Sequence, residues 1–492
     1  MSSQRNKSFI RLGIIAGIIL LALLIGQLTG YLDNVIEVLT AIGLVLIGIT
    51  ILVTVHELGH FLTAKAFGMR VETFSIGFPP KLFGFTRGET EYQIGATPLG
   101  GYVKISGIID ESLDTNHLQE EPKPYEFRAK PVWQRLIVMT GGVIMNVILG
   151  IAIFTGLKFG YPDTKLPMSQ VVYGIEVSPD GNTLGNLLGF QTGDSIISFK
   201  GESFPYFTDY TSQAILVDDG AYYEVKRNGE TLRIEVPGNV QNYFNHDTIS
   251  GFLFSPNAPA VVKVADSMRI AEGEKAVSAT PAFLAGMRTG DKIIRIDSQE
   301  IKLFSDLRDY LNGVSSREIN VGVLRGSDTL SFAFTTDADG KMGVNPDLES
   351  VFRLDTITYG LGDAFVKGST EAFSVVVTNF RGIKKLFRKD VDASKSVMGP
   401  IQIAKVYRDA SLIGGIKGFL RLTAMLSMIL AFVNILPIPA LDGGHVLFLL
   451  IEAVTRKEPS PKVRIVAQQI GMIFILGLMI LILFNDAFQV AS

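Results

Sequence analysis

The chain has 492 residues, which is too long for one ordinary domain and suggests about three units. Its formal net charge of -3 and pI near 6.0 give no indication of nucleic-acid binding, and its mean hydropathy of +0.32 is high for a soluble protein. The absence of cysteine excludes a disulfide framework and a thiolate metal site, but it does not fix the compartment.

Five apolar runs are long enough to cross a bilayer, which takes about 20 helical residues. They cover residues 12–32, 35–66, 132–158, 415–452 and 463–484. The first run follows basic residues, as a signal peptide does, but it is longer than the usual apolar region and no A-x-A-like cleavage site follows it. We therefore expect a polytopic α-helical membrane protein with five spans.

Lys and Arg in short loops orient the chain, because they favour the cytoplasmic side. Basic residues precede the first run, are absent from residues 33–37, and recur in residues 65–135 and 456–464. Five alternating spans with a cytoplasmic N-terminus satisfy all of these loops. Residues 159–412 then lie outside.

The second run contains His56-Glu57-Leu58-Gly59-His60. On a helix the two histidines share a face, so both imidazoles can bind one Zn²⁺ while the glutamate reaches a water on the metal. The chain has only five histidines, so a chance match is rare. The alternative is a pair of core histidines with a buried glutamate, which would leave three polar groups unpaired at membrane depth.

The outer region contains an internal repeat, since Leu187–Ile197 recurs as Leu284–Ile294. Each copy has a Gly-Asp turn before alternating apolar residues, a pattern typical of a turn that enters a strand. The repeat resembles PDZ domains, and its spacing predicts two in tandem. PDZ domains bind extended peptides at a sheet edge. The alternative is a pair of β-rich spacers with empty grooves.

Residues 360–388 alternate aromatic residues with Lys and Arg, which predicts one or two amphipathic helices. These helices would lie on the outer membrane face or pack against the second PDZ domain.

The fourth run is interrupted by the stretch from Asn434 to His445, which contains Pro437, Pro439 and a Gly-Gly pair. Prolines break a helix, and the freed backbone is tolerated at membrane depth only where it lines a cavity or is covered by protein. We therefore expect an active-site loop here. A catalytic zinc takes three protein ligands, and the chemistry alone does not choose between Asp442 and His445 for the third.

Together, HExxH and Asn-x-x-Pro-x-Pro-x-Leu-Asp-Gly-Gly resemble the site-2 protease family of intramembrane zinc metalloproteases over residues 40–485. The tandem PDZ insertion resembles its bacterial branch, the regulator of sigma-E protease type. The resemblance implies that His56, His60 and Asp442 bind zinc. It also implies that Glu57 is the general base and acid, and that His445 is a neighbour of the metal site.

Further stretches support the resemblance, and two depart from it. The similar stretches are Pro98–Lys104, Phe127–Pro131 and Met398–Ile401. Gly77–Pro80 stands where the family often has Gly-Phe-Gly-Pro, and Gly141–Asn146 stands where Ala-Gly-Pro-x-x-Asn is common. The second departure keeps Asn146 but removes the proline, and so puts in doubt any role that needs it.

The expected organisation is a four-helix site-2 protease core with an extra N-terminal span and two extracytoplasmic PDZ domains. The segments are an additional transmembrane segment (1–34), a core helix with HExxH (35–70), a β-rich membrane-associated loop (71–131), a second core helix (132–158), two PDZ domains (160–260 and 261–350), amphipathic linker helices (351–412), a third core segment (413–456) and a fourth core helix (461–485).

A protease must unwind a transmembrane helix before it can attack a carbonyl, and must replace the lost backbone hydrogen bonds. The stretch 71–105 can do so as an added strand, and Asn434 can both donate and accept. The alternative is that Asn434 caps the carbonyls freed around Pro437. The predicted substrate-binding residues are Asn434, Pro437, Pro439, Gly100 and Gly101.

We expect a zinc metalloendopeptidase that cuts single-span membrane proteins, of the anti-sigma-factor or remnant-signal-peptide type, in regulated intramembrane proteolysis. Its partners would be these substrates, the lipid bilayer and peptide ligands of the PDZ domains, with no nucleic acid. It would lie in the bacterial inner membrane with periplasmic PDZ domains. The alternatives are a catalytically idle receptor and an ion transporter that uses buried His and Asp.

Overall fold

The computed structural model describes residues 31–108, 121–179, 181–211, 220–240, 252–269, 277–387 and 398–491. The chain forms two compact units. The helical unit comprises Met1–Gly160, Gly360–Val377 and Met398–Ser492, and the repeat unit comprises Tyr161–Tyr359 and Thr378–Val397. The predicted first span, residues 12–32, lies outside the described residues.

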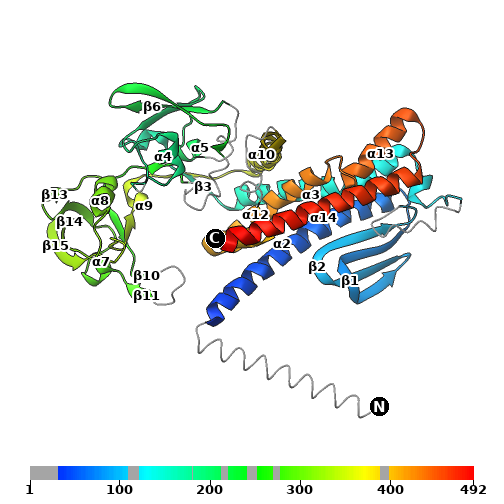
Figure 1. The fold of residues 1–492 in the computed structure, drawn as a ribbon, viewed down its shortest axis with the longest axis horizontal. Helices are drawn as coiled ribbons and strands as arrows, with labels where there is room; N and C mark the ends of the chain where they lie inside the picture. The colour runs from blue at the N-terminus through cyan, green and yellow to red at the C-terminus, as the bar shows by residue number, and fades with distance from the viewer. Residues whose placement is uncertain are drawn as a thin grey trace, which may run out of the picture. The chain divides into compact units, whose positions relative to one another are not determined.

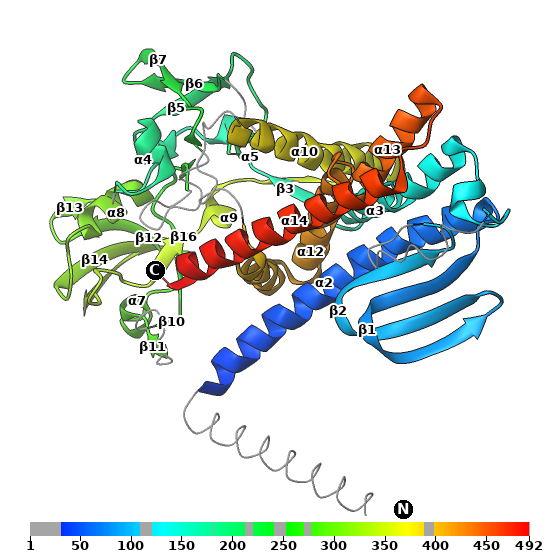
Figure 2. The same ribbon diagram turned by 45° about the vertical axis from the view of Figure 1, so that its right-hand side comes forward.

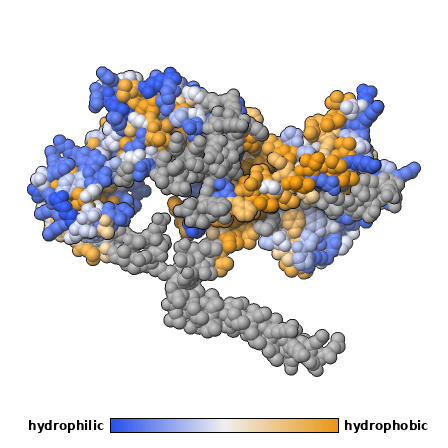
Figure 3. All heavy atoms as spheres, in the orientation of Figure 1, coloured by the Kyte–Doolittle hydropathy of each residue, from blue (hydrophilic) through white to orange (hydrophobic). Residues whose placement is uncertain are grey.

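Among the described residues, four helices are long and apolar enough to cross a membrane. They are α2 (Tyr31–Ala66), α3 (Val132–Gly160), α12 (Pro400–Asn434) and α14 (Pro461–Ala491). α2 and α12 pack against α3 and against each other, and α14 contacts α12 (Figure 1). Apolar side chains remain exposed along these helices (Figure 3), as expected for surfaces that face lipid.

The segment predicted as the third core span, 413–456, is broken in the structure. α12 begins at Pro400, bends at Gly415 where φ is 55°, and ends at Asn434, and α13 covers Asp442–Thr455. The break follows from the prolines at 437 and 439, whose rings and missing N–H groups do not continue a helix. The earlier start was not predicted, because Lys405 and Arg408 interrupt the apolar run.

A folded hairpin lies beside the end of α2 (Figure 2). Its strands are β1 (Val71–Arg87) and β2 (Thr90–Ile105), which pair antiparallel. The first half of β1 pairs on one side with residues 101–105 and on the other with residues 91–94. Residues 101–105 therefore form one edge of this sheet, and no other described strand pairs with them.

The predicted amphipathic stretch is one helix, α10 (Leu361–Phe387). Its first part packs on the C-terminal end of α3: a Cβ at Gly368 would lie 2.5 Å from the backbone nitrogen of Thr155, and Glu371 forms an ion pair of 3.3 Å with Lys158. Ala364 and Ala372 are buried on the same side. In the helical unit, α10 therefore packs against a spanning helix, which neither sequence-based alternative predicted.

The repeat unit contains two similar β-rich halves. The first has the sheet β5 (Ser195–Phe199), β6 (Tyr222–Arg227) and β7 (Glu230–Glu235), the pair β4 (Ile175–Glu176) with β8 (Ser255–Pro256), and the helices α4 (Leu184–Leu188) and α5 (Phe207–Tyr210). The second has the sheet β13 (Gln299–Glu300), β12 (Lys292–Ile296), β14 (Glu318–Arg325) and β15 (Asp328–Thr335), the pair β16 (Val344–Pro346) with β9 (Val262–Val264), and the helices α7 (Pro281–Leu284) and α8 (Phe304–Leu311). Each half has its own hydrophobic core, which is rich in aromatic residues in the first half and mainly aliphatic in the second.

The shorter elements complete the chain. They are the 3-10 turns η2 (Phe127–Ala129) and η3 (Met168–Gln170), the strands β3 (Asp163–Lys165), β10 (Ser267–Arg269), β11 (Val277–Ala279) and β17 (Asp355–Ile357), and the helix α9 (Leu348–Val351). β3 pairs with β17, so the two ends of the repeat region meet in one ladder.

The repeated sequence has repeated hydrogen bonds. In the first half, Arg227 donates to both carboxylate oxygens of Asp194, at 2.6 and 2.7 Å, and to the carbonyl of Gly189. In the second half, Arg325 does the same to Asp291 and to the carbonyl of Gly286. The Gly-Asp turn seen in the sequence is therefore held by an arginine on a later strand.

Candidate metal centre

The first two residues of the site lie on α2. His56 and His60 are one turn apart, are 7% and 6% exposed, and have their Nε2 atoms 3.2 Å apart. α2 contains no proline and is rich in Leu, Ile and Val. A helix satisfies all its own backbone groups at membrane depth, and its 3.6-residue period directs both imidazoles to one side.

The third residue is Asp442, the first residue of α13. Its Oδ2 lies 3.1 Å from Nε2 of His56 and 3.4 Å from Nε2 of His60. Two glycines after it permit the tight loop: a Cβ at Gly443 would lie 2.1 Å from the carbonyl oxygen of Leu436, and one at Gly444 would lie 2.6 Å from that of Ile438. The Gly-Gly pair thus lets the chain fold back and present Asp442 to α2.

These three atoms fit a zinc ion. Bonds of about 2.0–2.2 Å in a tetrahedron separate neighbouring ligand atoms by roughly 3.3 Å, and the three separations here are 3.2, 3.1 and 3.4 Å. The buried Oδ2 of Asp442 has no hydrogen-bond donor among the described residues. The same three residues form a cluster that can hold a metal. Two imidazoles and a carboxylate are a common ligand set for catalytic zinc.

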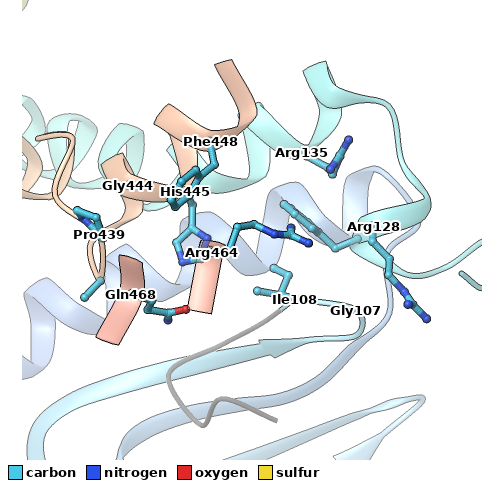
Figure 4. Close-up of a pocket in the computed structure, with 12 residues that line it drawn as sticks. Gly107, Ile108, Arg128, Arg135, Pro439, Gly444, His445, Phe448, Arg464 and Gln468 are labelled. Carbon is cyan, nitrogen blue, oxygen red and sulfur yellow. The ribbon is translucent and has the colours of Figure 1, made fainter. Parts of the chain in front are cut away.

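The geometry favours Asp442 over His445 as the third ligand, because only Asp442 lies with the two histidines. His445 is not part of the metal-binding cluster of described residues. It lines a cavity with Arg464 and Gln468 instead, as Figure 4 shows. His445 follows Asp442 by three residues on α13, but its ring is directed to this cavity.

Two further groups orient the histidines. Nδ1 of His60 lies 2.8 Å from the carbonyl oxygen of Val138, so Nδ1 carries the proton and Nε2 keeps its lone pair for a metal. Nδ1 of His56 lies 3.1 Å from the amide of Asn146, which is fully buried. Ser427 donates a 2.8 Å hydrogen bond to the backbone carbonyl of Asn146.

Asn146 can serve His56 in the metal-bound form. When Nε2 of His56 binds a metal, its Nδ1 carries the proton and needs an acceptor. The buried Oδ1 of Asn146 has no hydrogen-bond partner among the described residues, and a half-turn of the amide would present this oxygen to the ring. In the sequence Asn146 stands out only as part of a motif, although an amide inside an apolar span is a usable signal.

Three glycines allow α2 and α3 to approach at the site. A Cβ at Gly59 would lie 2.1 Å from the carbonyl oxygen of Gly141, and a Cβ at Gly142 would lie 2.5 Å from Nε2 of His60. Small residues are the usual way for membrane helices to come close. A side chain at position 142 would collide with His60, so this contact requires glycine. The family often has a proline at the next position, where this chain has Val143, and α2 and α3 approach closely without that proline.

The structure brings three of the other predicted site residues beside the cluster. Glu57 follows His56 on α2, and a Cβ at Gly101 would be 3.5 Å from its Cγ. Nδ2 of Asn434 lies 3.4 Å from Nε2 of His56. The edge of the hairpin sheet therefore lies against Glu57, and the end of α12 lies against His56.

The remaining predicted residues lie farther along the same elements. A Cβ at Gly100 would meet the Phe78 ring at 2.2 Å, so this glycine makes room within the hairpin. Pro437 is exposed in the loop after α12. The carbonyl of Pro439 packs on Gly471 of α14, where a Cβ would lie 1.7 Å away. Both prolines belong to the loop between α12 and α13, and their contact with a substrate stays a prediction.

Comparison with known proteins gives matches over almost the whole chain. The model of peptidase family M50 matches residues 44–478. The chain is 28% identical over 457 residues to "Regulator of sigma E protease" of Salmonella typhi, covering 90% of this chain and 97% of the relative. It is 27% identical over 463 residues to "Regulator of sigma-E protease RseP" of Escherichia coli K12, covering 90% and 97%. It is 27% identical over 451 residues to "Putative zinc metalloprotease" of Borreliella burgdorferi, covering 89% and 96%.

Proposed function

Because the chain belongs to peptidase family M50 and is a membrane zinc metalloprotease, we propose that it hydrolyses peptide bonds in or near the transmembrane segments of single-span proteins. The observation that carries this proposal is the triangle of ligand atoms, in which His56 and His60 lie on a helix of membrane-spanning length and Asp442 begins the short helix α13. An idle receptor or an ion transporter has no need of a glutamate beside a three-ligand metal set.

The proposed roles follow from the positions of the side chains. His56, His60 and Asp442 hold the zinc ion, which when bound polarises the scissile carbonyl and makes a water more acidic. Glu57 takes a proton from the attacking water and then passes it to the leaving amine. Glu57 follows His56 on α2 and lies beside Gly101, so it faces the hairpin edge where an extended substrate would lie.

The hairpin edge is the proposed binding surface for the unwound substrate. Residues 101–105 have no paired strand on their outer side among the described residues, so their N–H and C=O groups can pair with a substrate backbone. Asn434 would hold the same backbone from the other side of His56, because an amide both donates and accepts. The alternative for Asn434 is that it caps the carbonyls freed around Pro437.

The repeat unit is proposed to consist of two PDZ domains, extracytoplasmic in a protein whose N-terminus is cytoplasmic. In support, both halves have the same arginine-held Gly-Asp turn. A cavity of about 590 Å³ lies between α8 and the chain that leads into β16 in the second half. Phe304, Leu307 and Leu311 line it, and β16 pairs only with β9 among the described strands. An extended peptide could add there as a strand.

The proposed substrates are membrane-bound anti-sigma factors or remnant signal peptides of a bacterial inner membrane, already shortened by an earlier cut. The regulator names of the relatives support the first class. In the chain, the repeat unit is inserted between the second and third core spans, and we propose that it limits access for substrates with large outer domains.

Cleavage-site mapping tests both parts of this proposal. Full-length protein and a variant lacking residues 172–345, which retains β3 and β17, are reconstituted with a single-span substrate in short form and with a large outer domain. We expect both proteins to cut the short form inside its span, within about two-fold of one another. Only the deletion variant should cut the long form. Cuts confined to soluble segments would contradict the intramembrane function, and a folded, zinc-loaded but inactive deletion variant would contradict the gating role.

A further inference from the structure

A second polar cavity lies behind the loop that carries Asp442, and the proposed catalytic roles do not use it (Figure 4). It has a volume of about 50 Å³. Its polar lining consists of Arg128, Arg135, His445, Arg464 and Gln468, and its apolar lining includes Ile108, Phe127 and Phe448. The volume corresponds to roughly four water molecules or one tetrahedral oxyanion.

Each of the three arginines has N–H groups that its ion pair does not use. Each forms an ion pair with a glutamate that does not line the cavity: Arg128 with Glu126, Arg135 with Glu452, and Arg464 with Glu458. A guanidinium has five N–H groups, so one pair leaves several unused. Nη2 of Arg128, Nε of Arg135 and Nε of Arg464 are buried without a hydrogen-bond partner among the described residues. A buried N–H without an acceptor is costly.

Two more polar side chains that line the cavity, Gln468 and His445, also lack hydrogen-bond partners among the described residues. Gln468 is 8% exposed, and no described group forms a hydrogen bond with its amide. His445 lines the cavity in the same way, and the part of the chain that the structure describes provides it with no hydrogen-bond partner. No carboxylate lines the cavity among the described residues. The described walls therefore combine three guanidinium groups, an imidazole and an amide with no negatively charged side chain, which is the chemistry of an anion site.

The position of the cavity at the starts of two candidate membrane spans indicates which class of anion it would bind. Arg135 lies in the first turn of α3, and Arg464 lies in the first turn of α14. Both helices are candidate membrane spans, and the cavity brings these two starts together at one membrane face. First-turn arginines of spanning helices lie at the level of lipid headgroups, and basic pockets between such helices bind anionic lipids. The basic loops before both helices predict the cytoplasmic face.

From these observations we propose that the cavity binds the phosphate of an anionic membrane lipid. The site rests on the membrane-spanning assignment of α3 and α14, and it is separate from the zinc ligands. Pro439, Ala440 and Gly444 of its wall belong to the loop around Asp442, so an occupant also braces that loop. Lipid binding would then stabilise the metal centre from behind.

Thermal unfolding of the purified full-length protein in a neutral detergent tests the site. Dioleoyl phosphatidylglycerol, dioleoyl phosphatidylcholine and inorganic phosphate are the three probes. We expect phosphatidylglycerol to raise the unfolding temperature more than phosphatidylcholine. Arg464→Gln and Gln468→Leu should each weaken its binding by about ten-fold. Lys462→Gln, which removes one charge from the same helix turn but does not line the cavity, should bind like the wild type.

The outcomes separate the explanations. Equal lipid binding by Arg464→Gln, Gln468→Leu and Lys462→Gln would overturn the proposal, because the cavity would then hold only water. A full shift with inorganic phosphate alone would overturn the lipid assignment in favour of a free anion. Because lipid binding does not need catalysis, the result is independent of peptidase activity, which tests the proposed function separately.

Discussion

Three aspartates with buried carboxylate oxygens, two in the repeat unit and one in the helical unit, have opposite surroundings. In the repeat unit, Asp194 and Asp291 are each 1% exposed, and each accepts hydrogen bonds from an arginine and from a backbone N–H. In the helical unit, the buried Oδ2 of Asp442 faces only the Nε2 atoms of two histidines and has no donor among the described residues. A buried carboxylate that is saturated with hydrogen bonds holds a turn, whereas one that lacks donors is available to a cation.

The glycines beside these aspartates also have different roles in the two units. Gly193 and Gly290 precede the aspartates of the repeats and have φ of 95° and 93°, so each provides the turn that the arginine closes. Gly443 and Gly444 follow Asp442 and allow backbone to approach backbone. In the repeats, glycine and arginine together hold a turn of the fold. Beside Asp442, the two glycines let the chain bring a ligand atom to the histidines. The comparison predicts that changes at Asp442 affect metal and activity, whereas changes at Asp291 affect stability alone.

The largest effect is expected for Asp442→Ala, with His445→Ala as its matched control on the same helix. Without Asp442, two imidazoles remain, and zinc content and cleavage should both fall, cleavage by more than about 1,000-fold. His445→Ala should retain zinc, because His445 lies outside the cluster. Metal analysis of the purified variants measures this. Zinc retained by Asp442→Ala but lost by His445→Ala would reverse the ligand assignment.

A smaller effect is expected for Asn146→Leu. The substitution removes the acceptor that Nδ1 of His56 needs while zinc is bound, so zinc affinity should fall about 10–100-fold. Asn146→Asp, which retains an acceptor, should keep most of that affinity. Competition with a chelator gives the affinity without an activity assay. Equal affinities for the Leu variant and the wild type would show that Asn146 has only a packing role.

Asn434→Leu should act on the substrate and not on the metal. If Asn434 holds an unwound backbone, cleavage of strongly helical spans should fall by about ten-fold, and spans with Gly or Pro near the cut should be less affected. Zinc content and unfolding temperature should stay unchanged. An equal loss on both kinds of substrate, together with a lower unfolding temperature, would favour the capping role.

The smallest effect on activity is expected for Asp291→Asn. Burial disfavours the charged form of Asp291, but hydrogen bonds from the Arg325 guanidinium outweigh burial and hold the pKa of this carboxyl below its usual range. A carboxyl whose folded pKa is lowered stabilises the fold above its unfolded pKa, near 3.9, and this stabilisation is lost as pH falls through the folded pKa. The variant should therefore unfold at lower temperature at pH 7, and the difference from wild type should shrink in acid. Zinc content should not change, and a loss of zinc would contradict the separation of the two units.

Much of the site could be predicted from local sequence. His56, Glu57 and His60 lie within one helical turn of each other, so the helix period alone brings them together. The break after Asn434 follows from two prolines. In contrast, the choice of Asp442 over His445 needed the family resemblance, because the two lie three residues apart in the sequence and either side chain can bind zinc.

Other features could not be predicted because their partners are distant in the chain. Asn146 meets His56 only after α2 and α3 pack at Gly59 and Gly142. The donors of the second cavity come from three separate segments, and in the sequence its arginines indicate only the positive charge of loops. The hairpin was predicted as β-rich, but the folding of β1 between two parts of β2 depends on irregular register that no local pattern predicts.

Glu57→Gln tests the central claim most directly. The amide cannot take up a proton from water, but Glu57 lies outside the ligand cluster of His56, His60 and Asp442. We expect the purified variant to keep one zinc ion per chain and to lose cleavage of a single-span substrate that the wild type cuts. Retained cleavage would remove Glu57 as the general base, and loss of zinc would mean that the metal centre is built differently from the one described.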